Sequence, residues 1–164
     1  PTSGTDHIQL ITAKGQAIRF KETDVRDMGR NAAGVYGIRL HKDDAMVGMG
    51  VAKTDKDKKR NYQILTIMAH GYGKRTELSV YKVQGRGGSG IKTAKVTDKT
   101  GDITNAFLVN ADSMEDRDLI IISNNGQVIR TPFKTVSLLG RDTQGVRIMR
   151  FKDNDDRVSG VTWI

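Results

Sequence analysis

The stretch from Asp118 to Arg147, DLIIISNNGQVIRTPFKTVSLLGRDTQGVR, carries a pattern of glycines and arginines that the chain contains three times. An apolar run leads to a glycine, an arginine follows four residues later, and a Gly-Arg pair and a last glycine complete the pattern. The first glycine of each copy is Gly15, Gly71 or Gly126, and these lie 56 and 55 residues apart. Self-similarity at a fixed period of this size is typical of arrays and propellers, in which each repeat is one supersecondary unit.

The other members of the pattern keep the same offsets in all three copies. The chain therefore divides into three repeats, at approximately 7–61, 62–117 and 118–164, within a single domain of residues 1–164. The members that recur in register are the arginines Arg19, Arg75 and Arg130, the Gly-Arg pairs that contain Arg30, Arg86 and Arg141, and the last glycines Gly34, Gly90 and Gly145.

Each repeat reads as about four short β-strands. Ile8 to Thr12 and Ala17 to Phe20 flank the turn at Gly15 and predict a hairpin, because glycine takes the positive φ that tight turns need. In the third repeat, Leu119 to Ile122 is a continuous apolar run, which is typical of a strand buried on both faces. The remaining strands are expected at Val35 to Leu40 and Met46 to Val51, at Ile91 to Val96 and Ile103 to Val109, and at Val146 to Phe151 and Val158 to Trp163.

No segment shows a helical period over eleven residues, so the sequence predicts an all-β fold. Four strands in about fifty residues is the size of one propeller blade, an architecture that protects most sheet edges by radial repetition. Charged links between repeats, such as Ala52 to Asn61 and Asp112 to Asp116, are expected to be solvated loops.

Composition points to a polyanionic partner. The 164 residues carry a net charge of +8 with a pI near 9.8, and the positive excess is shared by all three repeats. Absence of cysteine excludes a disulfide scaffold, and no apolar run reaches the 18 residues of a membrane span. The N-terminal residues lack the pattern of a signal peptide, so the sequence is expected to be an excised piece of a cytoplasmic protein.

Motifs for nucleotide, metal or catalytic chemistry fail their context tests. Gly85 to Gly90 spells GxGxxG, but a strand is expected after it where a dinucleotide site needs a helix. Gly71 to Thr76 lacks two residues of a P-loop, and Asp153 to Asp156 lacks the third ligand and the glycine of a calcium loop. The three histidines show no metal-ligand spacing. No cofactor and no catalytic residue are predicted.

Basic residues that recur in register are the candidate site. Arginine and lysine at strand ends can also guard sheet edges against aggregation, and that reading stays open for each residue alone. Six arginines in register favour a surface that holds phosphates without reading bases. The candidate DNA-binding residues are Arg19, Arg30, Lys74, Arg75, Arg86, Lys92, Arg130, Arg141 and Arg147.

At these residues the sequence resembles a known family. The stretches RFKETDVRDMGRNAAGVYGIRL, GYGKRTELSVYKVQGRGGSGIKTAKVT and VIRTPFKTVSLLGRDTQGVRIM are similar to successive repeats of the C-terminal domain of the DNA gyrase A subunit. The resemblance covers nearly the whole chain. It implies a six-bladed β-pinwheel, a propeller variant with strands shared between blades, of which this chain would be the last three blades, a partial arc.

The resemblance also implies a function. The family's basic perimeter bends and wraps duplex DNA, and the wrap supports ATP-dependent negative supercoiling by a holoenzyme that also contains the rest of the gyrase A subunit together with the gyrase B subunit. The family's seven-residue box of glutamine, basic residues and glycines belongs to its first blade, and Gln84 to Gly90 lacks two of its basic residues. The catalytic tyrosine and the ATPase lie in other parts of the holoenzyme, so this chain is expected to be non-catalytic.

Two alternatives remain at this point. The C-terminal domain of the topoisomerase IV A subunit is the closest sibling, and three repeats this regular favour gyrase. A protein-interaction propeller of the kelch or chromosome-condensation-regulator type would need an aromatic anchor patch, yet aromatic residues are 5% of the chain.

A radial arc cut in the middle would expose one face of its first blade and one of its last. We expect those faces to be apolar and to pair in a homodimer of the fragment about a two-fold axis. The expected surface residues are Ile8, Leu10, Leu119, Ile121, Val161 and Trp163.

Overall fold

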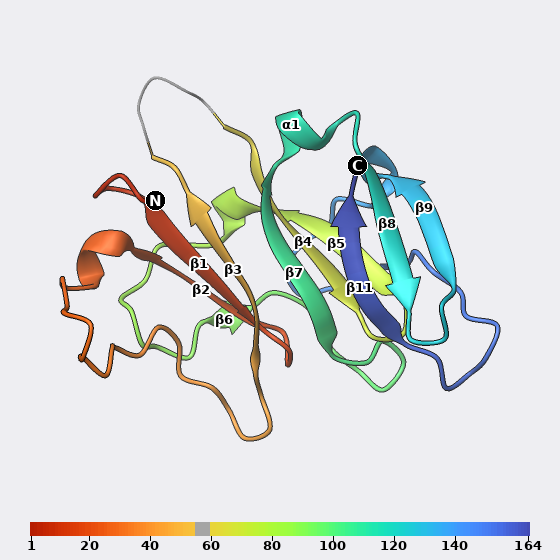
Figure 1. Ribbon diagram of the computed structural model, residues 1–164, viewed down its shortest axis with the longest axis horizontal. Coiled ribbons are helices and arrows are strands. Elements are labelled where there is room, and N and C mark those ends of the chain that lie inside the picture. Colours follow the sequence, from red (N-terminus) through yellow and green to blue (C-terminus); the bar gives the residue numbers. More distant parts are fainter. Residues whose placement is uncertain (55–59) are drawn as a thin grey trace.

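The chain folds into three antiparallel β-sheets that stand one after another along the molecule (Figure 1). This computed structural model describes residues 1–54 and 60–164. The all-β, propeller-like prediction is confirmed: the described α-helix α1 spans only Ala111–Met114. Part of the predicted loop from Ala52 to Asn61, residues 55–59, lies outside the described residues.

Blade 1 is a four-stranded sheet in the order β3-β1-β2-β6. Its β1–β2 hairpin turns at Gly15, whose φ of 84° is accessible to glycine at little cost. The same turn recurs at Gly71 and Gly126, with φ of 77° and 81°. The strands of blade 1 are β1 (His7–Thr12), β2 (Gln16–Lys21), β3 (Met46–Ala52) and β6 (Ile91–Lys92).

Blade 2 has the same arrangement, in the order β7-β4-β5-β10. Its strands β7, β4, β5 and β10 correspond in that order to β3, β1, β2 and β6 of blade 1. Blade 3 has three strands in the order β11-β8-β9. The strands of blade 2 are β4 (Tyr62–Met68), β5 (Tyr72–Glu77), β7 (Ile103–Asn110) and β10 (Val146–Arg147), and those of blade 3 are β8 (Asp118–Ser123), β9 (Val128–Pro132) and β11 (Val158–Trp163).

The fourth strand of each complete blade comes from the following repeat. β6 of the second repeat pairs with β2, where Ile91 lies opposite Ala17, and β10 of the third repeat pairs with β5, where Val146 lies opposite Gly73. The strand predicted at Val35 to Leu40 does not form, because within the described chain no preceding blade offers it an edge. Pairing with a neighbour, rather than local sequence, decides whether this segment is a strand.

A short 3-10 helix follows the second strand of every blade. These helices are η1 (Glu22–Asp24), η2 (Leu78–Val80) and η3 (Phe133–Thr135). Leu78 and Phe133 are buried, whereas η1 buries no residue. η2 and η3 each face the preceding blade, whereas the described residues include no blade in front of η1. This difference explains why η1 buries no residue.

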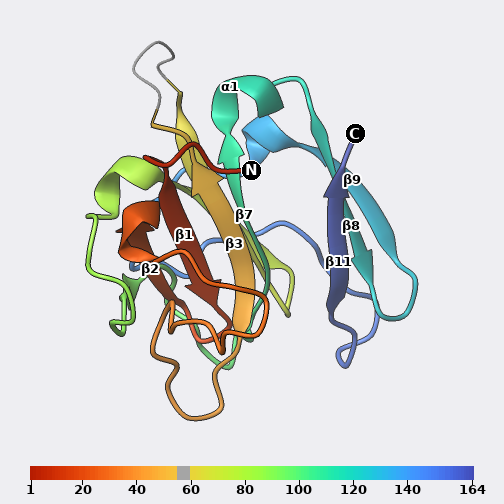
Figure 2. The same ribbon diagram turned by 60° about the vertical axis from the view of Figure 1, so that its left-hand side comes forward.

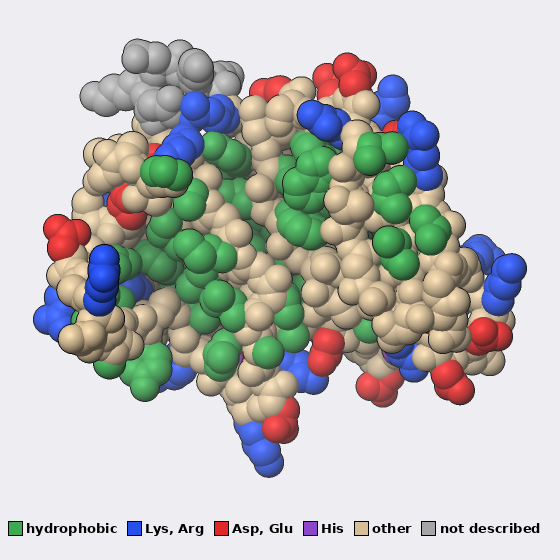
Figure 3. Space-filling view, in the orientation of Figure 1, with side chains coloured by type: hydrophobic (Ala, Val, Ile, Leu, Met, Phe, Trp, Pro, Cys, Tyr) green, Lys and Arg blue, Asp and Glu red, His purple; other side chains and the backbone are tan. Residues whose placement is uncertain are grey.

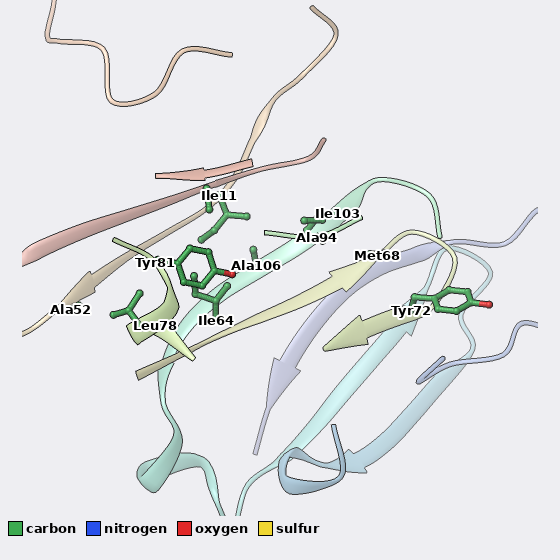
Figure 4. Close-up of a cluster of buried hydrophobic side chains, with 11 residues drawn as sticks. Ile11, Ala52, Ile64, Met68, Tyr72, Leu78, Tyr81, Ala94, Ile103 and Ala106 are labelled. Carbon is green, nitrogen blue, oxygen red and sulfur yellow. The ribbon is translucent and has the colours of Figure 1, made fainter. Parts of the chain in front are cut away.

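Two hydrophobic cores lie between successive blades. The first joins blades 1 and 2 around the Tyr81 ring, which lies among Ile11, Ile64 and Leu78 (Figure 4). The second joins blades 2 and 3 and includes Leu65, Leu119 and Phe133. Each core is built from the facing sides of two sheets, so an isolated blade would leave both of its faces uncovered.

The outer faces of the first and last blades differ from those expected. Leu119 and Ile121 are completely buried because they point toward blade 2, and the alternating residues Ile120 and Ile122 point outward. Successive side chains of a strand point to opposite faces. The prediction was one residue out of phase and therefore named the side chains of the wrong face. Figure 2 shows the sheet of β8, β9 and β11 at one end of the molecule.

The other expected face residues are also largely covered. Ile8 and Leu10 do point to the outer face of blade 1, but only 7% and 6% of each is exposed because they pack in a small cluster with Phe20 and Ile38. Val161 packs against the second core. Trp163 remains 36% exposed, and its ring lies edge-on to Phe107 with 5.1 Å between the ring centroids.

Glycines let the inner strands of blades 1 and 2 approach closely. A Cβ on Gly48 of β3 would lie 2.5 Å from the Ala106 carbonyl oxygen of β7, and one on Gly50 would overlap the Leu108 side chain. Figure 1 shows β3 and β7 side by side. The backbone contact fixes the separation of the two sheets.

We expect Gly48→Ala to lower the free energy of unfolding by about 1–3 kcal/mol, because the new methyl group meets backbone that cannot rotate away. Urea unfolding followed by circular dichroism measures the change. Gly85→Ala is the control, since a Cβ there would meet no atom within 4 Å. A Gly48→Ala variant as stable as the Gly85→Ala variant would contradict the close contact.

Among the described residues, no helix has the length and apolar character needed to cross a membrane.

Candidate nucleic-acid interface

The arginines four residues after the hairpin glycine fasten one blade to the next. The Arg19 guanidinium donates from Nη1 to the carbonyls of Leu78 and Tyr81, both at 3.3 Å. Both acceptors belong to the second repeat. The Arg19 backbone takes part as well, since its carbonyl accepts from Gln84 N at 2.7 Å.

Arg75 repeats this arrangement one blade further on. Its Nε donates to the Val136 carbonyl at 2.7 Å and its Nη2 to the Lys134 carbonyl at 3.4 Å. The guanidinium also lies over the Phe133 ring, 4.6 Å from its centroid. Burial lowers the pKa of both Arg19 and Arg75 below the usual arginine value. We call Arg19, Arg75 and Arg130 the clamp arginines.

A residue on the facing strand anchors each clamp arginine within its own blade. Arg75 Nη1 donates to Gln63 Oε1 at 3.2 Å, and Arg19 Nη2 lies 2.9 Å from His7 Nδ1. In blade 3 the Nε of Arg130 donates to Asp118 Oδ2 at 2.6 Å. Arg130 is therefore anchored in the same way, and the described residues include no carbonyl of a further blade for it to hold.

The loop arginines, Arg30, Arg86 and Arg141, act in the opposite direction along the chain. Arg86 donates from Nη1 to the Tyr36 carbonyl and from Nε to the Asp24 carbonyl at 3.1 Å, both in the preceding repeat. Arg141 donates from Nη1 to the Lys92 carbonyl at 3.0 Å. Tyr36 and Lys92 hold matching positions in successive repeats, so the two hydrogen bonds are equivalent. Arg30 is exposed at the open side of blade 1.

Lys74 was expected at the surface and lies in the interior instead. Its side chain is completely buried, and Nζ donates to the carbonyls of Gly140 and Arg141 at 2.7 and 2.6 Å and to Thr143 Oγ1 at 3.0 Å. Three acceptors satisfy the three N–H groups of the ammonium. Lys74 thus fixes the glycine loop of the third repeat, and its assignment as an exposed phosphate contact is wrong. Joint replacement of Lys74, Arg75 and Arg86 would therefore destabilise the fold.

Lys92 and Arg147 lie on the outermost strands β6 and β10, and both are exposed. Lys92 Nζ lies 3.4 Å from Asp142 Oδ1 in a solvent-exposed pair. Arg147 Nη2 donates to the Tyr72 hydroxyl at 2.8 Å and lowers the pKa of that phenol. Both cations keep a solvent-facing position at the outer edge of a blade.

A further basic position in register was missed by the sequence analysis. Arg39, Lys95 and Arg150 hold the same place in the three repeats, after the segment that forms the outer strands β6 and β10 in the second and third repeats. They are separated by the same 56 and 55 residues and are all exposed. The offset that identified the arginines could have found them. This position alternates between arginine and lysine, so it is not part of a pattern defined by identical residues. On the face in Figure 3, charged side chains lie around the margin and hydrophobic ones over the middle.

Several acidic residues lie in turns away from the basic row. Asp44 Oδ1 accepts from Lys14 N at 2.9 Å, and Asp156 Oδ1 accepts from Asn125 N at 3.1 Å. Asp102 forms a 2.9 Å ion pair with Lys14 across two repeats. These turns lie at the hairpin ends of the sheets rather than along β6 and β10.

The geometry of the GxGxxG motif does not fit a dinucleotide site. Gly85 to Gly90 is a loop that leads into the strand β6, so it lacks the helix N-terminus at which a dinucleotide pyrophosphate binds. Among residues 1–54 and 60–164, no group of three or more histidine, cysteine, aspartate or glutamate side chains could hold a metal ion.

Burial lowers the pKa of Lys74 to about 8. In the unfolded chain the ordinary value of 10.5 returns, so between pH 8 and 10.5 the unfolded state binds more protons and folding becomes more favourable as pH rises. Near pH 10 the gain is about 2–3 kcal/mol, since one pKa unit is worth about 1.4 kcal/mol.

Lys74→Ile is the matched variant, because Ile18 and Ile129 hold the same position in the other repeats. We expect the stability difference between the wild type and this variant to shift in favour of the wild type from pH 7.5 to pH 10, as measured by urea unfolding. Other titrating groups are common to both chains and cancel. A difference that stays constant with pH would contradict the buried ammonium.

Comparison with known proteins places these repeats. A family described as the DNA gyrase C-terminal domain, a β-propeller, matches residues 6–53, 63–110 and 117–162. Over 154 residues the chain is 39% identical to the DNA gyrase A subunit of Haloquadratum walsbyi, and the match covers 94% of the chain and 17% of that protein. Over 152 residues it is 40% identical to the DNA gyrase A subunit of Staphylococcus epidermidis, with 93% of the chain and 16% of that protein covered.

Solved structures agree with the fold. A DNA gyrase A C-terminal domain superposes with a TM-score of 0.78 at 28% identity, covering 96% of this chain and 50% of that one. The C-terminal domain of a DNA topoisomerase IV gives a TM-score of 0.83 at 18% identity, covering 98% of this chain and 47% of that one. Three matched repeats, gyrase relatives across nearly the whole chain and a shared fold establish that the chain belongs to the family of DNA gyrase A C-terminal domains.

Proposed function

We propose that this chain binds, bends and wraps duplex DNA without reading its sequence, as the C-terminal module of a DNA gyrase A subunit. The observation that carries the proposal is the row of exposed basic side chains on and beside the outermost strands of successive blades. The row consists of Arg39, Lys92, Lys95, Arg147 and Arg150.

A row of this kind suits the phosphate backbone. Duplex DNA carries one negative charge per about 1.7 Å of its axis, and each cation that neutralises a phosphate releases a counterion. Cations that recur once per blade follow a backbone that passes from blade to blade, and their binding energy offsets the cost of bending it. Base readout in the major groove needs an inserted helix or ribbon, and α1, the α-helix among the described residues, has four residues.

The site residues divide into two groups under this proposal. Lys92 and Arg147 remain candidate phosphate contacts, together with Arg39, Lys95 and Arg150. Arg30 and Arg130 are exposed and stay candidates at the two ends of the row. The bonds of Arg19, Arg75, Arg86 and Arg141 to neighbouring blades favour a structural role, and an exposed fraction of each guanidinium can still contribute positive potential.

The role within a larger assembly is also a proposal. The chain spans 16–17% of the length of the gyrase A relatives quoted above, so catalysis of strand passage would belong to the rest of the gyrase A subunit, whereas ATP hydrolysis would belong to the gyrase B subunit. The DNA-wrapping module would support negative supercoiling by that holoenzyme in the cytoplasm. It would require no cofactor of its own, and its three repeats of about 7–61, 62–117 and 118–164 would act as one domain.

The topoisomerase IV alternative rests on fold alone, because the similarity at TM-score 0.83 comes with 18% identity. Relatives at 39–40% identity favour gyrase.

We expect binding to duplex DNA to weaken steeply with salt and to depend little on sequence. If about four phosphates are neutralised, the slope of log K against log salt is about −3.6. The double variant Lys95→Ala with Arg150→Ala removes two phosphate contacts, so its slope should be shallower, about −1.8. Fluorescence anisotropy with two unrelated duplexes of about 40 base pairs measures both quantities.

Arg117→Ala is the control, because Arg117 is exposed between α1 and β8 and away from the outer strands. It should leave the slope unchanged. A slope near zero, a strong preference for one duplex, or equal loss in the control and the double variant would contradict the proposed surface. Unfolding curves of all variants should coincide, since exposed substitutions change stability by no more than about 0.5 kcal/mol each.

A further inference from the structure

A loop of the third repeat, residues 140–145, lies against the outer segment of blade 1. The Thr143 carbonyl accepts from Lys95 N at 3.0 Å, and the Lys92 carbonyl accepts from Arg141 Nη1 at the same distance. The side chains of Lys92 and Lys95 are exposed and belong to the basic row. We call residues 140–145 the bridging loop, because it holds the backbone that presents two candidate phosphate contacts of another blade.

The opposite side of this outer segment is fixed to the hairpin of blade 1. Ile91 lies opposite Ala17 in the pairing of β6 with β2, and Thr93 N donates to the Gly15 carbonyl at 2.8 Å. Thr93 is completely buried. The segment therefore lies between the hairpin and the bridging loop, and at Lys95 the backbone N–H is held by the loop.

The ion pair between the bridging loop and this segment is a weaker connection. Asp142 Oδ1 lies 3.4 Å from Lys92 Nζ, and both side chains are at least half exposed. A solvent-exposed pair of this kind holds a side chain weakly, because water screens the charges and both side chains lose freedom. The backbone bonds to Lys92 and Lys95 thus determine where the segment lies.

Lys74 supports the bridging loop from the interior of blade 2. Its ammonium donates to the carbonyls of Gly140 and Arg141 and to Thr143 Oγ1. Thr143 Oγ1 in turn donates to the Gly140 carbonyl at 3.0 Å. Arg141 and Thr143 are also the two loop residues that bond to blade 1. One buried cation therefore fixes both of the residues that reach the outer segment.

The same joint occurs one repeat earlier with an apolar support. Arg39 N donates to the Gly88 carbonyl at 2.9 Å, in the position of the Lys95 bond. Ile18 there holds the place of Lys74, and its Cδ1 lies 3.7 Å from where a Cβ on Gly88 would be. Each loop thus rests on the residue at this position of the preceding repeat. In the second joint the support consists of hydrogen bonds, which fix direction as well as distance.

We propose that Lys74 is a positioning residue for DNA binding, a role that rests on the function proposed above. Its ammonium holds the bridging loop, and the loop holds Lys92 and Lys95 at fixed places in the basic row. Lys74 is completely buried, so it acts on a phosphate through these two residues and not by contact. A cation whose backbone is already ordered loses less conformational entropy when a phosphate binds, and the affinity is higher for that reason.

Amide hydrogen exchange of the chain without DNA, followed by NMR, tests the support of the loop directly. Lys74→Ile carries the residue that the other two repeats have at this position. We expect the Lys95 amide to exchange about tenfold faster in this variant, because the loop that accepts its hydrogen bond loses its bonds to a charged group. The Arg39 amide is the matched control, and its rate should not change.

Thr143→Val is a second variant for the same measurement. It removes one acceptor of the ammonium and leaves the carbonyl that bonds to Lys95. It should accelerate exchange of the Lys95 amide by a smaller factor, and it decides the question if Lys74→Ile does not fold. A Lys95 amide that keeps the wild-type rate in the folded variants, or an acceleration shared equally by the Arg39 amide, would overturn the proposal.

A double-mutant cycle with duplex DNA, measured by fluorescence anisotropy, tests the effect on binding. Lys74→Ile should weaken binding by about two- to fivefold, the worth of one exposed ion pair. In a background of Lys92→Ala with Lys95→Ala this loss should disappear, because the positioned cations are gone. Arg147→Ala with Arg150→Ala is the matched background, since these residues hold the same positions in the next repeat, and there the loss should persist in full.

The cycle separates failure of the positioning role from failure of the proposed function. A loss of equal size in both backgrounds, or no loss in Lys74→Ile itself, would overturn the positioning role and leave the basic row as a DNA contact. If Lys92→Ala with Lys95→Ala binds DNA as tightly as the wild type, the proposed surface is wrong, and the positioning role is overturned with it. Circular dichroism melts check that every variant is folded.

Discussion

The structure depends on backbone pairing between repeats. A blade reaches four strands only when the following repeat lays its outer strand on the second strand of the hairpin, and the pairing is two residues long in each case. So short a ladder would not persist alone, because isolated two-stranded pairs are marginal in water. Half-buried arginines hold it on one side and an inter-blade core supports it on the other, so sheet completion, core burial and side-chain bonds form together.

This constraint explains the positions that recur in the sequence. The hairpin glycine must be left-handed and must also leave room for the incoming carbonyl, which a side chain at Gly15 or Gly71 would block. Arg19 and Arg75 reach carbonyls at the end of a 3-10 helix, where backbone oxygens lack partners within their own segment. Residues that keep strict register are therefore those that join blades, and residues that vary between lysine and arginine lie outside.

The sequence alone predicted the repeat period, the hairpins and the all-β class, because each of these depends on local residue pattern. It did not predict which side of a strand faces which neighbour. Leu119 and Ile121 read as end-face residues, although the alternate pair Ile120 and Ile122 takes that side. Nor did it reveal that Lys74 is buried, since nothing in GYGKRT distinguishes a lysine that meets three oxygens of a loop 66 residues away from one in solvent. Both errors concern tertiary partners.

The inter-blade bonds have a mechanical consequence for any polymer that follows the rim. Blades 1 and 2 are joined by rigid elements, with a glycine contact between β3 and β7 on the inside and the Arg19 guanidinium near the outside. Such a joint resists hinging, because closing or opening it would require backbone overlap or unpaired buried carbonyls. The radius of the rim is then a property of the folded chain and not of what lies on it. DNA held there would take its curvature from the protein. A substitution that weakens an inner contact between blades would therefore change the bend angle of the DNA more than its binding affinity.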